Sequence, residues 1–428
     1  MKKIITPKKN LEACIIVPGD KSISHRSVML GAIAHGITEI DGFLNGDDCL
    51  STISCFKKLG IQIEQIGNHV AVQGKGLHGL CAPSDTLDVG NSGTTLRLIS
   101  GILAAQPFSC EITGDSSIQK RPMDRVSIPL KQMGAEFISK NKEDKLFAPF
   151  QIIGKSLKAI HYTLPVASAQ VKSAILLAGL YTKGDTIITE PEKTRDHTEI
   201  MLNYLGANIE TQGNDIICHP VNEIYGKKII IPGDISSAAY FIVAGCICPN
   251  SCITIQNVGL NETRTGILSA MLKMGADIII SNEHICCGEK VGDIIVKSSS
   301  LKGTCIEGAE IPRLIDEIPI LAVAACFANG TTIIKDAQEL KVKESNRIQT
   351  VVTELKKLGA DIEETSDGMI IQGKQKPFIG CEIESYNDHR IAMSMTVAGL
   401  RASGKTIINN AQCVDISFPK FYDYIENF

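Results

Sequence analysis

The tetrapeptide KLGI at residues 58–61 recurs in related form at residues 132–135, 204–207, 273–276 and 357–360. A leucine or methionine followed by glycine is typical of a helix C-terminus, where glycine takes the left-handed conformation that side chains disfavour. Strand-like residues follow, as at 277–280. The glycines lie about 70 residues apart, which is longer than a solenoid repeat. Each repeat therefore combines helices and strands.

A second recurring element is a polar turn that leads into a helix rich in small apolar residues. It occurs six times, beginning near Gly19, Gly90, Ala167, Gly233, Asp316 and Asn387. A chain of 428 residues exceeds the usual size of a single hydrophobic core. We therefore expect an α/β protein in which six units divide into two domains of three, with an active site between the domains.

Composition excludes several classes of protein. Apolar residues make up 44% of the chain and charged residues 21%, as in a globular enzyme. A net charge of −4 and an aromatic content of 5% argue against a general nucleic-acid surface. The apolar runs are too short for membrane spans or a secretory signal. We expect a cytoplasmic protein without membrane or nucleic-acid partners.

Metal-binding motifs are not found in the sequence. It contains neither a Cys-x-x-Cys pair nor the His-Glu-x-x-His spacing of zinc enzymes. We therefore expect no metal and no cofactor.

The segment PGDKSISHR, residues 18–26, predicts an anion site. We expect a turn followed by a helix over residues 27–34, whose free N–H groups and positive dipole end favour negative charge. Lys21 and Arg26 add full positive charges, and Ser22 adds a hydroxyl. Phosphate or carboxylate would fit this site, although a solvated helix cap is the alternative for this segment alone.

Other helix starts in the first half carry similar groups. In residues 90–97, Gly93 would let backbone N–H groups approach an anion closely. Arg121, in a polar loop, suits a carboxylate or phosphate. Ser168 and Gln170 could bind ligand hydroxyls, with ordinary helix capping as the alternative. Arg195 lies in a further charged turn.

The second half adds carboxylates among its cations. Asp316 precedes the apolar run 318–325, so a carboxylate that can act as a base should lie beside a helix start. Residues 343–347 and 387–390 combine cations with a carboxylate or histidine. A charge run alone usually marks a solvated face. Recurrence at equivalent positions favours a site.

Taken in order, residues 18–26, 90–97, 120–122, 343–347 and 387–390 resemble the 3-phosphoshikimate 1-carboxyvinyltransferase (EPSP synthase) family over nearly the whole chain. The resemblance implies an enolpyruvyl transferase fold, in which three βαβαββ-type repeats surround a pseudo-threefold axis in each domain. It implies one domain of residues 1–19 and 235–428, another of residues 20–234, and an active site in the interdomain cleft. Residues 168–172, 195–199 and 261–264 resemble the class II branch.

The resemblance also implies the activity. The enolpyruvyl group of phosphoenolpyruvate is transferred to the 5-hydroxyl of shikimate 3-phosphate by addition and elimination, which gives 5-enolpyruvylshikimate 3-phosphate and phosphate. This step belongs to the shikimate pathway, which leads to chorismate and the aromatic amino acids. Neither a metal nor a cofactor is implied, and we expect a monomer.

Roles for individual residues follow from the same resemblance. Shikimate 3-phosphate would contact Lys21, Ser22, Arg26, Ser168, Gln170, Arg195, Asp316 and Lys343. Phosphoenolpyruvate would contact Lys21, Gly93, Arg121, Arg347 and Arg390. Asp316 would accept the hydroxyl proton, and Glu344 would serve proton transfer at the methylene carbon, with Lys21 or His389 assisting. The family is the target of glyphosate, and the class II motifs together with Gly93 predict intermediate tolerance.

Two alternatives remain open. The related UDP-N-acetylglucosamine enolpyruvyltransferase carries a cysteine, or in some members an aspartate, before an Arg-Pro pair. Here Ser116 and Ser117 lie in that stretch, with Asp115 nearby. The other alternative is a noncatalytic protein that binds phosphate ligands. Asp316 and Glu344 weigh against it, because anion binding gains nothing from carboxylates near the ligand.

Overall fold

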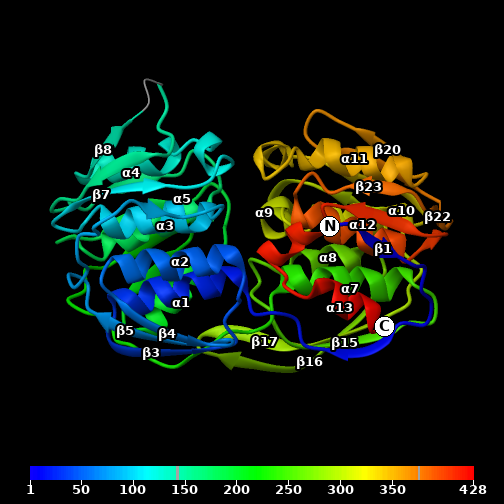
Figure 1. Ribbon diagram of the computed structural model, residues 1–428, viewed down its shortest axis with the longest axis horizontal. Coiled ribbons are helices and arrows are strands. Elements are labelled where there is room, and N and C mark those ends of the chain that lie inside the picture. Colours follow the sequence, from blue (N-terminus) through cyan, green and yellow to red (C-terminus); the bar gives the residue numbers. More distant parts are fainter. Residues whose placement is uncertain (141–143, 375) are drawn as a thin grey trace. The chain divides into compact units, whose positions relative to one another are not determined.

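The computed structural model describes residues 1–140, 144–374 and 376–428 (Figure 1). It divides into two compact units. Unit 1 comprises Met1–Pro18, Pro232–Ile285 and Lys290–Phe428, and unit 2 comprises Gly19–Ile231 together with Cys286–Glu289. Each unit has its own hydrophobic core.

The strands of unit 2 follow one repeated topology. They are β3 (His35–Asp41), β4 (Gln62–Ile66), β5 (His69–Lys75), β6 (Leu87–Asp88), β7 (Ser109–Thr113), β8 (Glu136–Ser139), β9 (Phe150–Ile153), β10 (His161–Thr163), β11 (Thr186–Thr189), β12 (Ile209–Gln212), β13 (Asp215–Cys218) and β14 (Ile229–Ile230). The described part forms sheets of order β14-β3-β5-β4, β6-β7-β9-β8 and β10-β11-β13-β12. In each sheet the first two strands are parallel and the other pairs antiparallel.

The helices of unit 2 connect these strands. They are α1 (Lys21–Ile33), α2 (Asp47–Lys58), α3 (Gly93–Leu103), α4 (Asp124–Met133), α5 (Ala169–Gly179) and α6 (His197–Tyr204), with a 3-10 turn at Ile118–Lys120. A parallel strand pair needs a crossover connection, so α3 lies between β6 and β7, and α5 between β10 and β11. The resulting order β-α-β-α-β-β matches the expected repeat.

Helices α1, α3 and α5 are almost entirely buried, which explains their small apolar residues. Gly101 shows how closely two of them approach: a Cβ atom there would lie 2.1 Å from the carbonyl oxygen of Ala174. Only glycine permits this contact between α3 and α5. The last turn of α3 therefore packs directly against the middle of α5.

Unit 1 repeats the pattern, except that its third group of strands is divided between two smaller sheets. Its strands are β1 (Lys3–Ile5), β2 (Glu12–Ile15), β15 (Cys252–Gly259), β16 (Asp277–Cys286), β17 (Glu289–Lys297), β18 (Cys305–Ile306), β19 (Gly330–Ile334), β20 (Asp361–Glu364), β21 (Met369–Gly373), β22 (Phe378–Ile379), β23 (Glu382–Glu384), β24 (Ala402–Ser403) and β25 (Thr406–Asn409). Among the described residues, the sheets have the orders β2-β15-β17-β16, β18-β19-β21-β20, β1-β25-β23 and β22-β24. The N-terminal strand β1 thus pairs with β25 near the C-terminus.

The helices of unit 1 contribute buried side chains to its hydrophobic core. They are α7 (Ile235–Ile247), α8 (Gly266–Lys273), α9 (Ile311–Leu314), α10 (Ile318–Cys326), α11 (Arg347–Lys357), α12 (His389–Gly399) and α13 (Phe421–Glu426), with 3-10 turns at Gly308–Glu310, Gln338–Val342 and Ala411–Ile416. Phe241 of α7 packs against Phe418 and Phe421, with ring centroids 5.9 and 6.1 Å apart. The C-terminal segment therefore completes this core.

The repeated sequence elements behave as predicted. The helix-ending glycines are left-handed, with φ of +85° at Gly60, +114° at Gly134, +103° at Gly206, +89° at Gly275 and +93° at Gly359. All six polar turns precede helices. In the part of the chain that the structure describes, no helix is long and apolar enough to cross a membrane.

One expected boundary was wrong. The first helix begins at Lys21 and not near residue 27. The side chain of Asp20 caps it by accepting a hydrogen bond from the backbone N–H of Ile23 at 2.9 Å. Lys21 and Arg26 therefore lie on the helix itself, with Lys21 at its positive end.

Candidate active site

The first candidate residue of unit 2, Lys21, is the first residue of α1. Lys21 forms an ion pair with Asp48, which lies in the first turn of α2. Asp48 is buried, and the Lys21 side chain is about one-fifth exposed. The Lys21 ammonium is thus held at the helix N-terminus, where an anion would meet both the charge and the helix dipole.

Arg26 connects three helices. Its Nε donates to Oγ1 of Thr198 at 2.7 Å, and its Nη2 donates to Oγ of Ser173 at 2.9 Å. Its Nη1 donates to the carbonyl oxygen of Ser22 at 3.0 Å. The residue is 5% exposed. These contacts fix the guanidinium of α1 beside the starts of α5 and α6.

Gln170 connects the first turn of α5 to that of α3. Its Oε1 accepts from Nη1 of Arg97 at 2.6 Å, and its Nε2 donates to Oγ1 of Thr94 at 3.1 Å. Ser168 occupies the N-cap position of α5 but makes no side-chain capping hydrogen bond. Ordinary helix capping therefore does not explain either residue.

Gly93 is the first residue of α3 and lies against two guanidinium groups. A Cβ atom at this position would lie 3.1 Å from Nη1 of Arg97 and 3.3 Å from Nη1 of Arg121. Arg121 also donates to Oγ of Ser117 at 3.3 Å. The first turn of α3 thus combines backbone N–H groups, two cations and a space that glycine leaves open.

Arg195 directly follows the segment 190–194, which the buried side chain of Lys172 contacts. Lys172 Nζ lies 3.0 Å from Oε2 of Glu190 and 2.6 Å from Oε1 of Glu199, and it donates to the carbonyl oxygen of Thr194 at 3.4 Å. Burial raises the pKa of Glu199, although Lys172 opposes this shift. Burial disfavours the charged form of Lys172, but the negative charges of Glu199 and Glu190 outweigh this effect. The pKa of Lys172 is therefore raised.

Arg347 gathers three carboxylates in unit 1. Its Nε donates to Oδ2 of Asp388 at 2.8 Å, its Nη2 to Oε2 of Glu344 at 2.5 Å, and its Nη1 to Oδ1 of Asp316 at 3.4 Å. Arg347 is 1% exposed. Burial raises the pKa of Asp388, but Arg347 and His389 outweigh this effect and lower it overall.

Arg390 holds Asp316 from another direction. Its Nη1 donates to the backbone carbonyl of Asp316 at 3.0 Å, and its Nη2 lies 3.9 Å from Oδ2 of the same residue. The neighbouring Glu317 lies 3.8 Å from Arg390 Nη1 and accepts a hydrogen bond from Ser236 Oγ. Asp316 is therefore a carboxylate placed between two arginines, just before α10.

Two further candidates lie at neighbouring helix starts. His389 is the first residue of α12 and is buried, and Asp388 caps that helix through the backbone N–H of Arg390 at 2.9 Å. Lys343 lies between a 3-10 turn and α11, with Nζ 3.4 Å from Oε1 of Glu339.

Within each unit the structure thus brings several of the candidates together, whereas the ion pair given above for Lys343 is with Glu339, which is not a candidate. The starts of α1, α3, α5 and α6 form a largely cationic group in unit 2, and the starts of α10, α11 and α12 form a mixed group in unit 1. Sequence reasoning missed the supporting side chains Asp48 and Ser173. It included Thr198, Glu317 and Asp388 in its motifs but gave them no individual role. These side chains lie at or near helix starts, which the sequence pattern can indicate. Their hydrogen-bond partners lie far away in the chain, so the sequence alone does not indicate the contacts.

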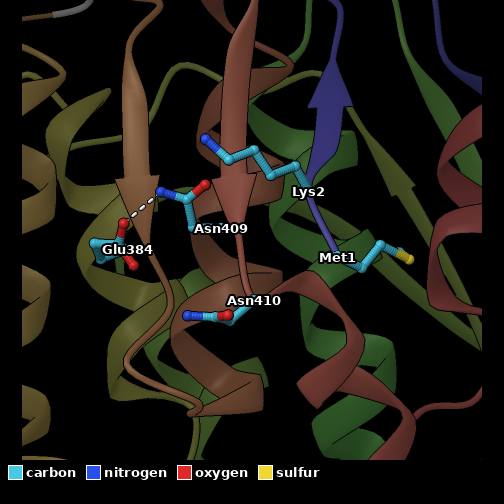
Figure 2. A pocket seen from close by; sticks show the side chains of 5 residues that line it. All are labelled: Met1, Lys2, Glu384, Asn409 and Asn410. Atoms are coloured by element: carbon cyan, nitrogen blue, oxygen red, sulfur yellow. Dashed lines mark hydrogen bonds between the residues drawn. The ribbon is translucent and has the colours of Figure 1, made fainter.

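Another feature of unit 1 is an open hollow at the N-terminus (Figure 2). It is lined by Met1, Lys2, Glu384, Asn409 and Asn410, and the amide of Asn409 donates to Glu384. No candidate residue lines it. Within the described ranges, no group of three or more His, Cys, Asp or Glu side chains could hold a metal ion.

Comparison with known proteins decides the family. The family model of EPSP synthase (3-phosphoshikimate 1-carboxyvinyltransferase) matches residues 5–425. The chain belongs to the EPSP synthase family. The resemblance expected from the motifs is therefore confirmed.

Relatives within the EPSP synthase family match along their full length. A 3-phosphoshikimate 1-carboxyvinyltransferase from Thermoanaerobacter sp. (strain X514) is 57% identical over 419 residues, which cover 98% of each chain. One from Desulforamulus reducens is 54% identical over 427 residues, covering 100% of this chain and 99% of the relative.

A solved structure of EPSP synthase from Acinetobacter baumannii is 46% identical and has a TM-score of 0.90. The match covers 100% of this chain and 97% of the other. Together with the repeated sheets, this similarity confirms the expected enolpyruvyl transferase fold.

Proposed function

We propose that the two groups of helix starts together perform the reaction of the EPSP synthase family. That reaction transfers the enolpyruvyl group of phosphoenolpyruvate to the 5-hydroxyl of shikimate 3-phosphate and releases phosphate. The observation that supports this assignment best is the placement of Asp316 between Arg347 and Arg390. Both substrates are highly anionic, so cations must neutralise them before a base can activate an alcohol.

The acceptor, shikimate 3-phosphate, would be held mainly by unit 2. The residues assigned to it are Lys21, Ser22, Arg26, Ser168, Gln170 and Arg195, with Asp316 and Lys343 from unit 1. The fixed guanidinium of Arg26 supports this assignment, since an arginine held by three protein contacts is already oriented for a phosphate. Gln170 supplies an amide for ligand hydroxyls.

The donor, phosphoenolpyruvate, would meet cations from both units. The residues assigned to it are Lys21, Gly93, Arg121, Arg347 and Arg390. The open space at Gly93 between Arg97 and Arg121 supports a small, doubly anionic ligand there. Arg97 would be an additional cation beside the donor, since its guanidinium lies next to Gly93.

The addition step requires two proton transfers. Asp316 would accept the proton of the 5-hydroxyl while the oxygen attacks C2 of phosphoenolpyruvate. The electron pair of the double bond moves to C3, which takes a proton from Glu344, with Lys21 or His389 assisting. General acid and base catalysis of this kind contributes about 100- to 10,000-fold in rate.

In the elimination step the proton transfer at C3 runs in the opposite direction. The bond between C2 and the phosphate oxygen breaks and phosphate leaves with the electron pair, while Glu344 would take a proton from the C3 methyl group. The double bond forms again on the transferred group. Arg347 and Arg390 would stabilise the leaving phosphate, because cations placed where negative charge develops lower the barrier.

We also propose the remaining properties of the chain. It would act as a cytoplasmic monomer without nucleic-acid or membrane partners, and without a cofactor. The domains would comprise residues 1–19 with 235–428, and residues 20–234. The acidic net charge supports the lack of a nucleic-acid partner.

Acceptor choice tests the proposal. Phosphate release from phosphoenolpyruvate should occur with shikimate 3-phosphate and not with UDP-N-acetylglucosamine. Release with the nucleotide sugar would assign the chain to the related transferase. Binding of both substrates without release, measured by calorimetry, would favour a noncatalytic protein.

A further inference from the structure

Four side chains inside unit 2 form a continuous line of hydrogen bonds. Nδ1 of His25 lies 2.7 Å from Oγ1 of Thr52, which lies 2.7 Å from Oγ1 of Thr95. Thr95 Oγ1 donates to Oγ of Ser92 at 2.7 Å. All four side chains are buried, at 0% exposure. The line crosses from α1 through α2 to α3.

The direction of the donors follows from counting protons. The hydroxyl hydrogen of Thr95 is used toward Ser92, so Thr95 accepts from Thr52. The single hydroxyl hydrogen of Thr52 then points to Thr95 at 2.7 Å and not to the carbonyl oxygen of Asp48, which lies farther away at 3.4 Å. His25 must therefore donate from Nδ1. The other ring nitrogen, Nε2, is buried without a hydrogen-bond partner among the described residues. A line of donors pointing one way is cooperative.

Thr52 is the junction of this line, and it lies one helical turn from the residue that holds Lys21. Lys21 and His25 are four residues apart on α1, and Asp48 and Thr52 are four residues apart on α2. Residues with this spacing lie on one face of a helix. The Lys21–Asp48 ion pair and the His25–Thr52 hydrogen bond are therefore successive contacts between the same two helices.

The other end of the line reaches the first turn of α3. Ser92 is the N-cap residue of α3, and its Oγ accepts from both the hydroxyl and the backbone N–H of Thr95, the latter at 3.1 Å. Gly93 follows directly. The line therefore connects the element that carries Lys21 with the element that carries Gly93.

We propose that Thr52 is a positioning residue for the donor site, because it fixes the Lys21 ammonium and the first turn of α3 relative to each other. The inference rests on the roles proposed above for Lys21, which is assigned to both substrates, and for Gly93, which is assigned to the donor alone, so the donor should be affected more strongly. Thr52 itself would contact neither substrate. Its hydroxyl acts through His25 of α1 on one side and through Thr95 and Ser92 on the other.

Substitution of Thr52→Val keeps the shape but removes the hydroxyl, whereas Thr52→Ser keeps the hydroxyl. Thr38→Val is the matched control, because Thr38 is equally buried in unit 2 and its Oγ1 has no hydrogen-bond partner among the described residues. Thr95→Val breaks the same line at the next position and serves as the second variant.

The first measurement is amide hydrogen exchange of residues 90–96 in the protein without substrates, so it does not depend on the proposed function. We expect exchange to rise at least tenfold in Thr52→Val and Thr95→Val, and to stay at the wild-type rate in Thr52→Ser and Thr38→Val. Unchanged exchange in both Val variants would overturn the proposal.

The second measurement separates the two substrates. In Thr52→Val the KM for phosphoenolpyruvate should rise at least fivefold more than the KM for shikimate 3-phosphate. The double variant Thr52→Val/Thr95→Val should be no worse than either single variant, since both break one line. Equal changes in both KM values, or fully additive effects, would refute a positioning role. Failure of the wild type to release phosphate would instead refute the proposed function.

Discussion

Gly93 lies so close to Arg121 that a Cβ atom on Gly93 would be 3.3 Å from Nη1 of the arginine. The same atom would be 3.1 Å from Nη1 of Arg97. These distances are tighter than ordinary van der Waals contact. The identity of residue 93 therefore controls the space between two cations at the start of α3.

Gly93→Ala should weaken donor binding. An added methyl group in a filled site costs about 1–3 kcal/mol, so we expect the KM for phosphoenolpyruvate to rise by roughly tenfold or more. Steady-state kinetics with both substrates varied will measure this. Gly184→Ala is the control, because within 4 Å a Cβ atom there would meet, among the described residues, only Ala159 Cβ, at 3.7 Å. An unchanged donor KM in Gly93→Ala would remove Gly93 from the donor site.

Glyphosate inhibition provides a related prediction. The class II motifs together with Gly93 predict intermediate tolerance in the wild type, and Gly93→Ala should weaken inhibition further because less space remains. The inhibition constant should be measured at a matched ratio of phosphoenolpyruvate to its KM. Inhibition of the wild type as strong as that of a sensitive family member would contradict the prediction.

Lys172→Met should destabilise unit 2. The substitution leaves Glu190 and Glu199 buried without their shared cation. Removing one partner of a buried ion pair costs about 3–5 kcal/mol, which urea unfolding at neutral pH will measure. Lys335→Met is the control, since Lys335 and Glu307 form an exposed pair and their loss should barely change the midpoint. Equal effects of the two substitutions would contradict this account of the Lys172 cluster.

His25 should make the protein sensitive to acid. Burial lowers the pKa of His25 to about 3, from an ordinary value near 6.5. Between these two values the unfolded chain binds a proton that the folded chain does not, so stability is lost as the pH falls. The slope is about 1.4 kcal/mol per pH unit well below pH 6.5.

Comparison with His25→Gln isolates this effect. Between pH 7.5 and pH 5 the wild type should lose about 2 kcal/mol more stability than the variant. The comparison uses the change with pH, so a constant destabilisation of the variant does not matter. His284→Gln, at an exposed histidine, should keep the wild-type dependence. The same pH dependence in His25→Gln and the wild type would show that His25 does not contribute.

Much of the fold could be predicted from local sequence signals. The glycines at helix ends and the polar turns at helix starts act over a few residues, so they can be read without a structure. The start of α1 differs from the expectation because Asp20 is itself the N-cap residue, so the helix begins directly after it and not beyond a longer turn. That difference moved Lys21 and Arg26 onto the helix.

The candidate site was harder to predict in detail. Arg26 and Thr198 are 172 positions apart, and Arg97 and Gln170 are 73 apart, yet each pair forms a short hydrogen bond. Such contacts depend on how α1, α3, α5 and α6 pack and not on any local pattern. The motifs therefore indicated which residues are chemically suitable, whereas packing determines which side chains hold them.

In the proposed mechanism, Asp316 takes the proton of the acceptor hydroxyl. Asp316→Asn keeps the size of the side chain but removes its basicity. We expect kcat to fall by about 100- to 10,000-fold, while the Kd for shikimate 3-phosphate, measured by calorimetry, changes little. A kcat close to that of the wild type, or a loss of binding that accounts for the whole loss of activity, would contradict the assignment of Asp316 as the base.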